Sequence, residues 1–545
     1  MLNPRTLRLS RKFNGQTTES HKTYFQEPPI PPQKSSRGIL RTVVIGTGFT
    51  CFGAYAHSWV TGIPILGLGL EDLDGDGGPE MEAMAVDAMT TAMQAVTAKQ
   101  VPPMNLERAH EVLQAGSAYS TTPTAVAHTS SLASNLPCED TWSSGSYTYF
   151  NDQTKDWCEW AIFDGHAGPR TSELLRSHLP GAVGEALGAA NCLERPYTPN
   201  DTHITETIKK TFTTLDDQMI SQAKELIESD VVDRANAIAA AAIVHSGSCA
   251  LLALYDPKRR ILRVANTGDS RAVLGRWDKD ANKYIAHAMS IDQTGFNQDE
   301  VTRLARDHPG EKVVDSKTGR VHGIAVSRAF GDARWKWPQE VSRRAHEMFW
   351  GPTPRSDSMI QTPPYLTAIP EIIETRVNTG AHPDFLVMAS DGLWDCMSNE
   401  DAVSCVQLWL DKNKPTNFLE QAKDDGGLGL VPVPLRAVAG RTASNANTPE
   451  SPAPTFSSMA DLNGNHDTYF DAEEKCLKWL VKPRYFVNED DHCGIHLVRN
   501  ALGGSRRDLF CSLMTLQPPL SRRVRDDITV HVIFFGQDTQ DLLNN

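Results

Sequence analysis

Five short acidic segments could act together chemically, because each lies at one end of a strand-like run. Asp164 and Asp391 each precede a glycine after an apolar run, and Gly268-Asp269 follows another such run. Asp526-Asp527 comes directly before ITVHVIFF, and Glu139-Asp140 comes just ahead of a further apolar stretch. A single Asp-Gly is usually only a turn. Several strand ends that converge would instead make a cage of oxygen ligands, which suits Mg²⁺ or Mn²⁺ rather than zinc or copper.

Such a cage has a specific chemical use. Two divalent cations can acidify a bridging water and hold the oxygens of a phosphoryl group during an in-line displacement. Without cations, the mutual repulsion of the carboxylates would make the cluster costly. If the strand ends converge, the acidic segments would therefore form a metal centre suited to phosphoryl chemistry.

The runs that would position these carboxylates read as strands. WCEWAIFDGHAG, ILRVANTGDSR and FLVMASDGLWD are apolar up to their acidic turns, and ITVHVIFF alternates like a half-buried strand. Amphipathic helices lie between them. Asn297 and Glu300 fit a capping box that opens a helix, and Pro309-Gly310 would end it. Strands interspersed with a few such helices predict packed antiparallel sheets with helices outside.

Composition and charge narrow the classes of function. The chain has 545 residues, of which 40% are apolar and 22% charged, as in a folded globular protein. The first 41 residues contain eight Lys or Arg and two acidic residues, whereas the remainder contains 45 and 65. Nucleic acid is therefore not an expected partner, because a broad nucleic-acid interface needs a basic footprint.

The N-terminal part has the composition of a targeting signal. Residues 1–38 begin with an Arg-rich, hydroxyl-rich stretch that has no acid before Glu19, which is typical of a mitochondrial targeting segment, and end in a Pro-rich linker. A solvated tail is the alternative. Residues 39–60 are a candidate for a single transmembrane helix, although their glycines also fit a buried or interfacial segment.

The rest of the chain divides by composition. Residues 61–106 are expected to be a linker, and residues 107–540 are expected to form the catalytic domain. Residues 412–467 are rich in Gly, Pro, Ser, Asn and Ala, so they predict a low-complexity insertion at the surface.

Taken in order, the motifs resemble those of the metal-dependent type 2C serine/threonine protein phosphatases. FDGHAG, GSCALLALYD, VANTGDSRAVL, HGIAVSRAFGD, MASDGLWD and RDDITVHVIFF follow that family's order. SNLPCED, SRAFGDARWKW and RDDITV, with Asp in place of the more usual Asn at 527, resemble the pyruvate dehydrogenase phosphatase branch and its fungal relatives. The resemblance implies an α+β fold, an αββα sandwich of two antiparallel sheets flanked by helices, with a metal centre in a cleft at one edge.

The resemblance also implies roles for individual residues. The implied ligands of two Mg²⁺ or Mn²⁺ ions are Asp140, Asp164, the carbonyl of Gly165, Asp391 and Asp526. Glu139 would hold waters bound to the metals, and Asp269 sits where the family can bind a third, weaker ion. His166 matches the residue proposed as general acid for the leaving serine or threonine oxygen, a role that suits an imidazole near neutral pH.

One position departs from the common pattern. Many members have an Arg four residues before the Glu of the first metal motif, where its planar fork can hold phosphate bidentately. Here that position is Asn135, and the pyruvate dehydrogenase phosphatase branch resembles this chain in lacking the Arg. Asn135 is therefore the candidate substrate-binding residue, through one or two amide hydrogen bonds, and the main phosphate-holding group stays unassigned.

The expected function is hydrolysis of phosphoserine or phosphothreonine in proteins by a metal-bridging water. The resemblance points to the pyruvate dehydrogenase complex as substrate and to the mitochondrion, in the matrix or the intermembrane space, with an inner-membrane anchor as a candidate feature. The alternative is an inactive pseudophosphatase scaffold, which would be expected to lack a metal carboxylate, whereas all are present. A small-molecule phosphohydrolase is a third reading, which a comparison of phosphopeptides with sugar phosphates would separate.

Overall fold

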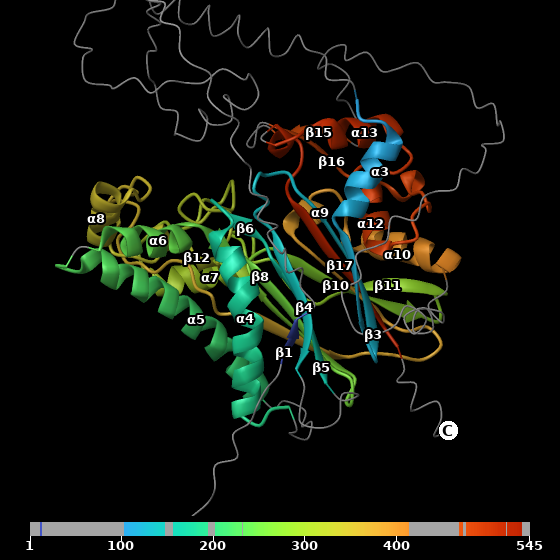
Figure 1. Cartoon of the computed structure of the whole chain (residues 1–545), viewed down its shortest axis with the longest axis horizontal. Helices are drawn as coiled ribbons and strands as arrows, with labels where there is room; N and C mark the ends of the chain where they lie inside the picture. The colour runs from blue at the N-terminus through green and yellow to red at the C-terminus, as the bar shows by residue number, and fades with distance from the viewer. Residues whose placement is uncertain are drawn as a thin grey trace, which may run out of the picture. The chain divides into compact units, whose positions relative to one another are not determined.

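Two antiparallel sheets form the centre of the protein, and helices cover their outer faces (Figure 1). The computed structural model describes residues 11–13, 103–147, 156–193, 202–231, 233–413, 468–471, 476–518 and 520–536. Within these residues the layers are helix, sheet, sheet and helix. The predicted αββα sandwich is confirmed.

The first sheet has six strands and is covered by a helical layer. In spatial order its strands are β1 (Arg11–Phe13), β4 (Thr141–Tyr147), β5 (Trp157–Phe163), β8 (Ala250–Asp256), β9 (Ile261–Thr267) and β13 (Glu371–Arg376). The helices on this side are α4 (Arg170–Ala189), α5 (His203–Glu228), α6 (Arg234–His245) and α8 (Gln339–Phe349). Leu175 and Leu179 of α4 and Phe212 of α5 pack on Phe163 and Leu252 of the sheet.

The second sheet also has six strands and carries its own helices. In spatial order its strands are β11 (Lys283–Ala288), β10 (Arg271–Asp278), β14 (Phe385–Ala389), β17 (Ile528–Phe535), β3 (Ala125–Leu132) and β2 (Ser117–Thr122). The helices on this side are α3 (Leu106–Ala115), α10 (Asn399–Asn413), α12 (Cys493–Ala501) and α13 (Arg507–Thr515). Trp409 of α10 and Leu497 of α12 belong to the core that packs on Val387 and Val532.

The strand β17 corrects one expectation. Its alternating sequence predicts a half-buried strand, but all eight residues are buried. Val530 faces the helices and Ile533 faces the first sheet, so β17 has a core on both sides. His531 is tolerated there because Thr129 and the carbonyl of Ala161 contact its two ring nitrogens at 2.7 and 3.2 Å. Burial lowers the pKa of His531 to about 4, which keeps it neutral.

Smaller elements complete the described part. They are β6 (Gly165–His166), β7 (Gly247–Ser248) and β12 (Phe330–Gly331), which form a small sheet, β15 (Thr468–Asp471) and β16 (Cys476–Trp479), the helices α7 (Gln298–Asp307) and α9 (Asp391–Trp394), and the 3₁₀ turns η2 (Ala333–Trp335), η5 (Pro483–Tyr485) and η6 (Ser521–Arg523). The turns and short strands bring the acidic segments to one end of the sandwich.

The expected domain limits differ in detail from the observed elements. The packed chain begins before residue 107, since Asn105 caps α3 and the Met104 N–H donates to Thr515 Oγ1 at 2.6 Å. Helix α10 continues to Asn413, into the range predicted as an insertion. Three residues of the expected targeting segment form β1, which pairs with β4.

Two further predictions concern segments outside the described residues. The candidate transmembrane segment 39–60 and most of the insertion, 414–467, lie outside the described residues. Within the part of the chain that the structure describes, no helix is long and apolar enough to cross a membrane.

Candidate active site

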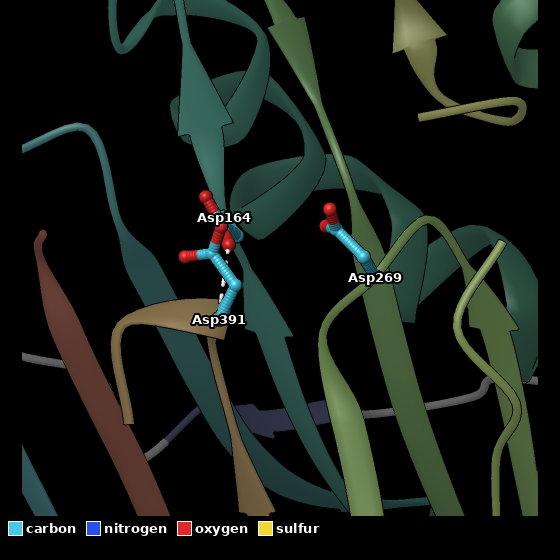
Figure 2. Close-up of side chains that lie close together, drawn as sticks. All are labelled: Asp164, Asp269 and Asp391. Carbon is cyan, nitrogen blue, oxygen red and sulfur yellow. Dashed lines mark hydrogen bonds between the residues drawn. The ribbon is translucent and has the colours of Figure 1, made fainter. Parts of the chain in front are cut away.

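Three carboxylates converge at one end of the two sheets. Asp164 directly follows β5, Asp269 lies in the turn between β9 and β10, and Asp391 opens α9, separated from the end of β14 by Ser390. One carboxylate oxygen from each lies within 4.8 Å of those of the other two. Figure 2 shows the three side chains around a common space, with the Asp391 N–H donating to Asp164 Oδ2 at 3.4 Å.

Two glycines allow the acidic segments to approach one another closely. A Cβ on Gly165 would lie 2.4 Å from the carbonyl oxygen of Glu139, and a Cβ on Gly392 would lie 2.2 Å from that of Asp527. Any side chain at either position would push these backbones apart, because real Cβ contacts are never so short. The glycine in each Asp-Gly turn therefore packs one acidic segment against another.

The remaining two carboxylates among the predicted metal ligands, Asp140 and Asp526, flank this group. The Asp140 carboxylate, ahead of β4, accepts a hydrogen bond from Ser390 Oγ at 2.7 Å. Asp526, ahead of β17, forms an ion pair with Arg522, and its Oδ1 accepts the Asp527 N–H at 2.7 Å. The structure thus brings Asp140, Asp164, Asp391 and Asp526 into one region, and their role as metal ligands stays a prediction. It also places Asp269, expected at a third and weaker ion, directly beside Asp164 and Asp391.

The electrostatics of this region favour a bound cation. Burial, and next the neighbouring Asp527, raise the pKa of Asp140 to about 8. Burial and the neighbouring aspartates raise the pKa values of Asp164 and Asp391 well above the ordinary range. Burial raises the pKa of Asp526 to about 6 even though Arg522 opposes it. Ionised carboxylates crowded in this way repel one another unless a cation lies among them.

The donor set decides which cation fits. The converging group of Asp164, Asp269 and Asp391 offers oxygen atoms alone. Hard divalent cations such as Mg²⁺ and Mn²⁺ prefer oxygen ligands, whereas zinc and copper sites usually include His or Cys. The residues present therefore fit Mg²⁺ or Mn²⁺.

The loop before β4 is fixed by the buried carboxylate of Asp527, which belongs to one of the acidic segments expected at the strand ends. Asp527 Oδ1 accepts the N–H groups of Ser134 and Asn135 at 2.5 and 3.0 Å. Its Oδ2 accepts the Glu139 N–H at 2.9 Å and the Asn135 side-chain amide at 3.3 Å. One carboxylate therefore sets the position of the loop that carries both Glu139 and Asp140.

The surroundings of Asn135 differ from the sequence expectation. Its Nδ2 donates to Glu139 Oε2 at 2.9 Å as well as to Asp527. Glu139 Oε1 in turn accepts the Gly168 N–H at 2.5 Å. The amide thus bridges two carboxylates of the protein, so its hydrogens are already engaged and it is a poor candidate for holding phosphate.

His166 lies beside the metal group and has its own partner. Its Nε2 lies 2.7 Å from Asp332 Oδ2, and the Asp332 side chain is 1% exposed while that of His166 is 31% exposed. Burial opposes protonation, but Asp332, Asp269 and Glu139 together raise the pKa of His166. Since a carboxylate can only accept, Nε2 carries a hydrogen.

Three residues of this site, Asp332, Ser390 and Arg522, were not predicted from the sequence, and Asp527 was predicted only as one of the strand-end carboxylates. Asp332 stands in a Gly-Asp motif that was quoted for its resemblance, and Ser390 directly precedes a predicted ligand. The Gly-Asp turn is the local signal that could have found Asp332. Arg522 carries no local signal, because its role depends on the ion pair with Asp526.

Comparison with known proteins agrees with this geometry. The family Protein phosphatase 2C matches residues 135–426. This chain belongs to that family. It is 37% identical to a protein phosphatase 2C homolog of Schizosaccharomyces pombe over 75% of this chain and 80% of the relative. Its enzyme class is therefore that of a metal-dependent protein serine/threonine phosphatase.

Other phosphatase relatives bear a more specific name. The chain is 34% identical to mitochondrial pyruvate dehydrogenase (acetyl-transferring) phosphatase 1 of Saccharomyces cerevisiae, over 72% of this chain and 64% of the relative. It is 29% identical to the corresponding human phosphatase 2, over 62% of this chain and 56% of the relative. A solved serine-threonine phosphatase 2C from Toxoplasma gondii is similar at 14% identity with a TM-score of 0.41, covering 77% of this chain and 97% of that one.

Proposed function

We propose that this phosphatase removes phosphate from phosphoserine and phosphothreonine in proteins at the centre around Asp164, Asp269 and Asp391. The observation that supports this site is the convergence of three carboxylate oxygens within 4.8 Å at the end of the two sheets. Asp140, Asp164, the carbonyl of Gly165, Asp391 and Asp526 would hold two cations, and Asp269 a third. When bound, Mg²⁺ or Mn²⁺ lowers the pKa of a water and neutralises charge on the phosphoryl group.

The protein's own side chains would orient the Glu139 carboxylate and supply a proton. Asp527 and Asn135 hold the loop that carries Glu139, so the Glu139 carboxylate keeps one orientation toward the centre. His166 Nε2 lies against Asp332 and would donate to it, and the charged imidazole would carry its second proton at Nδ1. That proton is available to the serine or threonine oxygen as it leaves, and the buried Asp332 carboxylate stabilises the charged imidazole before transfer.

A change of leaving group offers a direct test of the proton-donor role of His166. A phosphoserine peptide needs a proton on its leaving oxygen, whereas p-nitrophenolate leaves without one. We expect His166→Ala to lower turnover of the peptide at least about a hundredfold, and that of p-nitrophenyl phosphate much less. Equal losses on both substrates would contradict the proton-donor role. No metal-dependent release of phosphate from any phosphopeptide by the unchanged protein would contradict the proposed function and favour a pseudophosphatase.

The substrate and the location are proposed from the names of the relatives. The proposal includes the phosphorylated pyruvate dehydrogenase complex as substrate and the mitochondrion as location, supported by the yeast and human proteins of that name and by the composition of residues 1–38. The test is whether the protein dephosphorylates the intact complex faster than sugar phosphates, together with protease protection in intact and swollen mitochondria.

The domain organisation is proposed on the same footing. Residues 1–38 would direct import, and the catalytic domain would begin near residue 103 rather than 107, since Asn105 caps α3. A protein starting at Pro103 should be active. One starting at Glu107 should lose about 1 kcal/mol of stability with the cap. Deletion of residues 426–460 should leave hydrolysis of a small phosphopeptide intact.

A further inference from the structure

The segment just before β17 lies directly against the loop that carries Asn135. Ser521 Oγ donates to the Ser134 carbonyl at 2.6 Å, and Arg525 Nη1 donates to the Ala133 carbonyl at 2.8 Å. Together with the hydrogen bonds from this loop to Asp527, these contacts join two segments that are almost 400 positions apart. The turn η6, which carries Arg522, is therefore fixed beside the position where many family members have their phosphate-holding arginine.

Arg522 places a guanidinium group at the edge of the carboxylate centre. Its Nη1 pairs with Asp526 Oδ2, and its side chain is 50% exposed. Burial lowers the pKa of Arg522, but Asp526, Asp391 and Asp527 together raise it. Its charge also acts on Glu139. The guanidinium thus lies close to the acidic residues on the Asn135 side of the site.

The donors of Arg522 are only partly used. A guanidinium has five N–H donors in a fixed fork, and within the described residues its one ion pair is with Asp526. Asn135, by contrast, directs its amide at Glu139 and Asp527. Arg522 therefore has N–H groups that remain available for a ligand, whereas the side-chain amide hydrogens of Asn135 are already used.

We propose that Arg522 holds the phosphoryl group of the substrate, in place of the arginine that the family commonly carries at the position of Asn135. The guanidinium reaches the centre from η6 instead of from the loop before β4. Its pairing with Asp526 orients the fork, and its remaining N–H groups bind phosphoryl oxygens that carry negative charge. This inference rests on the proposed phosphatase function and assigns the group that binds its substrate.

Direct binding of inorganic phosphate tests the assignment without relying on turnover. We compare the full chain with Arg522→Gln by calorimetry in Mn²⁺, and measure Mn²⁺ affinity separately. Loss of a charge-assisted fork should weaken phosphate binding about tenfold or more. Mn²⁺ should bind the variant as tightly as the unchanged protein or more tightly, because Arg522 no longer competes for Asp526.

Kinetics on a phosphoserine peptide give a second readout. Arg522→Gln should raise KM about tenfold with a small change in kcat, which is the pattern for a group that binds substrate and transition state alike. Arg523→Gln is the matched control, since Arg523 lies in the same turn and is exposed, and it should match the unchanged protein. Asn135→Arg added to Arg522→Gln should restore phosphate binding by returning a guanidinium from the neighbouring loop.

Two results would overturn the assignment. One is phosphate affinity and KM in Arg522→Gln equal to those of the unchanged, active protein. The other is a loss of phosphate affinity that is matched by a loss of Mn²⁺ affinity, since Arg522 would then only keep the metal centre in shape. Neither result would affect the proposed function, which fails only if the unchanged protein hydrolyses no phosphopeptide.

Discussion

Buried carboxylates occur in two regions of this protein, with opposite electrostatics. Glu300, in α7, is 1% exposed, yet its pKa is lowered to about 2, because hydrogen bonds from Arg328, Arg303 and Ser327 outweigh its burial. Its oxygens accept Arg328 Nη2 at 2.6 Å and Arg303 Nη2 at 2.9 Å. At the centre around Asp164 and Asp391, burial and like charges raise the pKa values instead.

The two regions differ in the source of the positive charge that balances their carboxylates. At Glu300 the chain supplies its own cations, so the charge is balanced in the folded protein alone. At the centre, the described residues place two positively charged groups, Arg522 and His166, at the edges. These two groups do not balance the carboxylates, which are Asp140, Asp164, Asp269, Asp391 and Asp526. The first region stabilises the fold, and the second sacrifices stability for a site that a cation from solution must complete.

The largest effect should come from removing a carboxylate of the centre. Asp164→Asn should lower turnover of a phosphopeptide at least about a thousandfold, or ~4 kcal/mol in the barrier, while the protein stays folded because a repulsive charge is gone. Phosphate release and circular dichroism check the two parts. Chelation of the unchanged protein should likewise abolish activity, and Mg²⁺ or Mn²⁺ should restore it. Near-normal turnover in the variant, or a trapped phosphoenzyme, would contradict the mechanism.

A change at Glu300 should affect stability instead. Glu300→Gln leaves Arg328 and Arg303 without their carboxylate, so the free energy of unfolding should fall by about 3 kcal/mol. Denaturant unfolding measures the loss. Asp299→Asn, at the exposed neighbouring position, should cost under about 1 kcal/mol. A comparable loss in both variants would show that the buried network has no special weight.

Cation binding should stabilise the protein through the centre. At a Mn²⁺ concentration of about 100 times its dissociation constant, the free energy of unfolding should rise by about 2.7 kcal/mol. Thermal unfolding with Mn²⁺ and with chelator measures the difference. Glu300→Gln should show the same increase and Asp391→Asn a much smaller one. A full increase in Asp391→Asn would place the cation elsewhere.

Acid should weaken the regions whose charges are balanced internally. Asp490 accepts Arg499 Nε and Nη2 at 2.7 and 2.9 Å. Burial raises the pKa of Asp490, but His110 and Arg499 outweigh burial and lower this pKa to about 2. A carboxylate with a lowered folded pKa contributes stability above its ordinary pKa and loses it as pH falls. About 2 kcal/mol should therefore disappear between about pH 4 and pH 2. Asp490→Asn should flatten the acid side of the stability curve, and an unchanged curve would contradict this.

The smallest expected effect concerns Asn135, whose side-chain amide donates hydrogen bonds to two carboxylates at the centre. Asn135→Ala frees Glu139 and removes one of the donors to Asp527. The catalytic efficiency kcat/KM should fall about tenfold, or ~1.4 kcal/mol, mainly through kcat because Asn135 positions a carboxylate. A variant indistinguishable from the unchanged protein would mean that the other hydrogen bonds to Asp527 hold the loop by themselves.

Local pattern predicted the strands and their acidic ends, because apolar runs and Asp-Gly turns are local features. The runs up to Phe163, Thr267 and Ala389 end as strands where the sequence indicates. Contacts between distant segments were not predictable in this way. Asn297 caps α7 as expected, but Glu300 turns away from the predicted capping box to meet Arg328.

The position of β17 has a consequence for how the chain folds. This strand, from near the C-terminal end of the described chain, lies between β14 and β3 and pairs along its length with Ala125–Leu132. Until it inserts, β3 and β14 each present an open edge, which invites pairing with other chains. The sheet closes only after the polypeptide is available as far as Phe535, so non-local pairing should make folding slow. Because Asp526 and Asp527 directly precede this strand, the catalytic centre should be assembled in the final folding step, and partly made chains should carry no stray phosphatase activity.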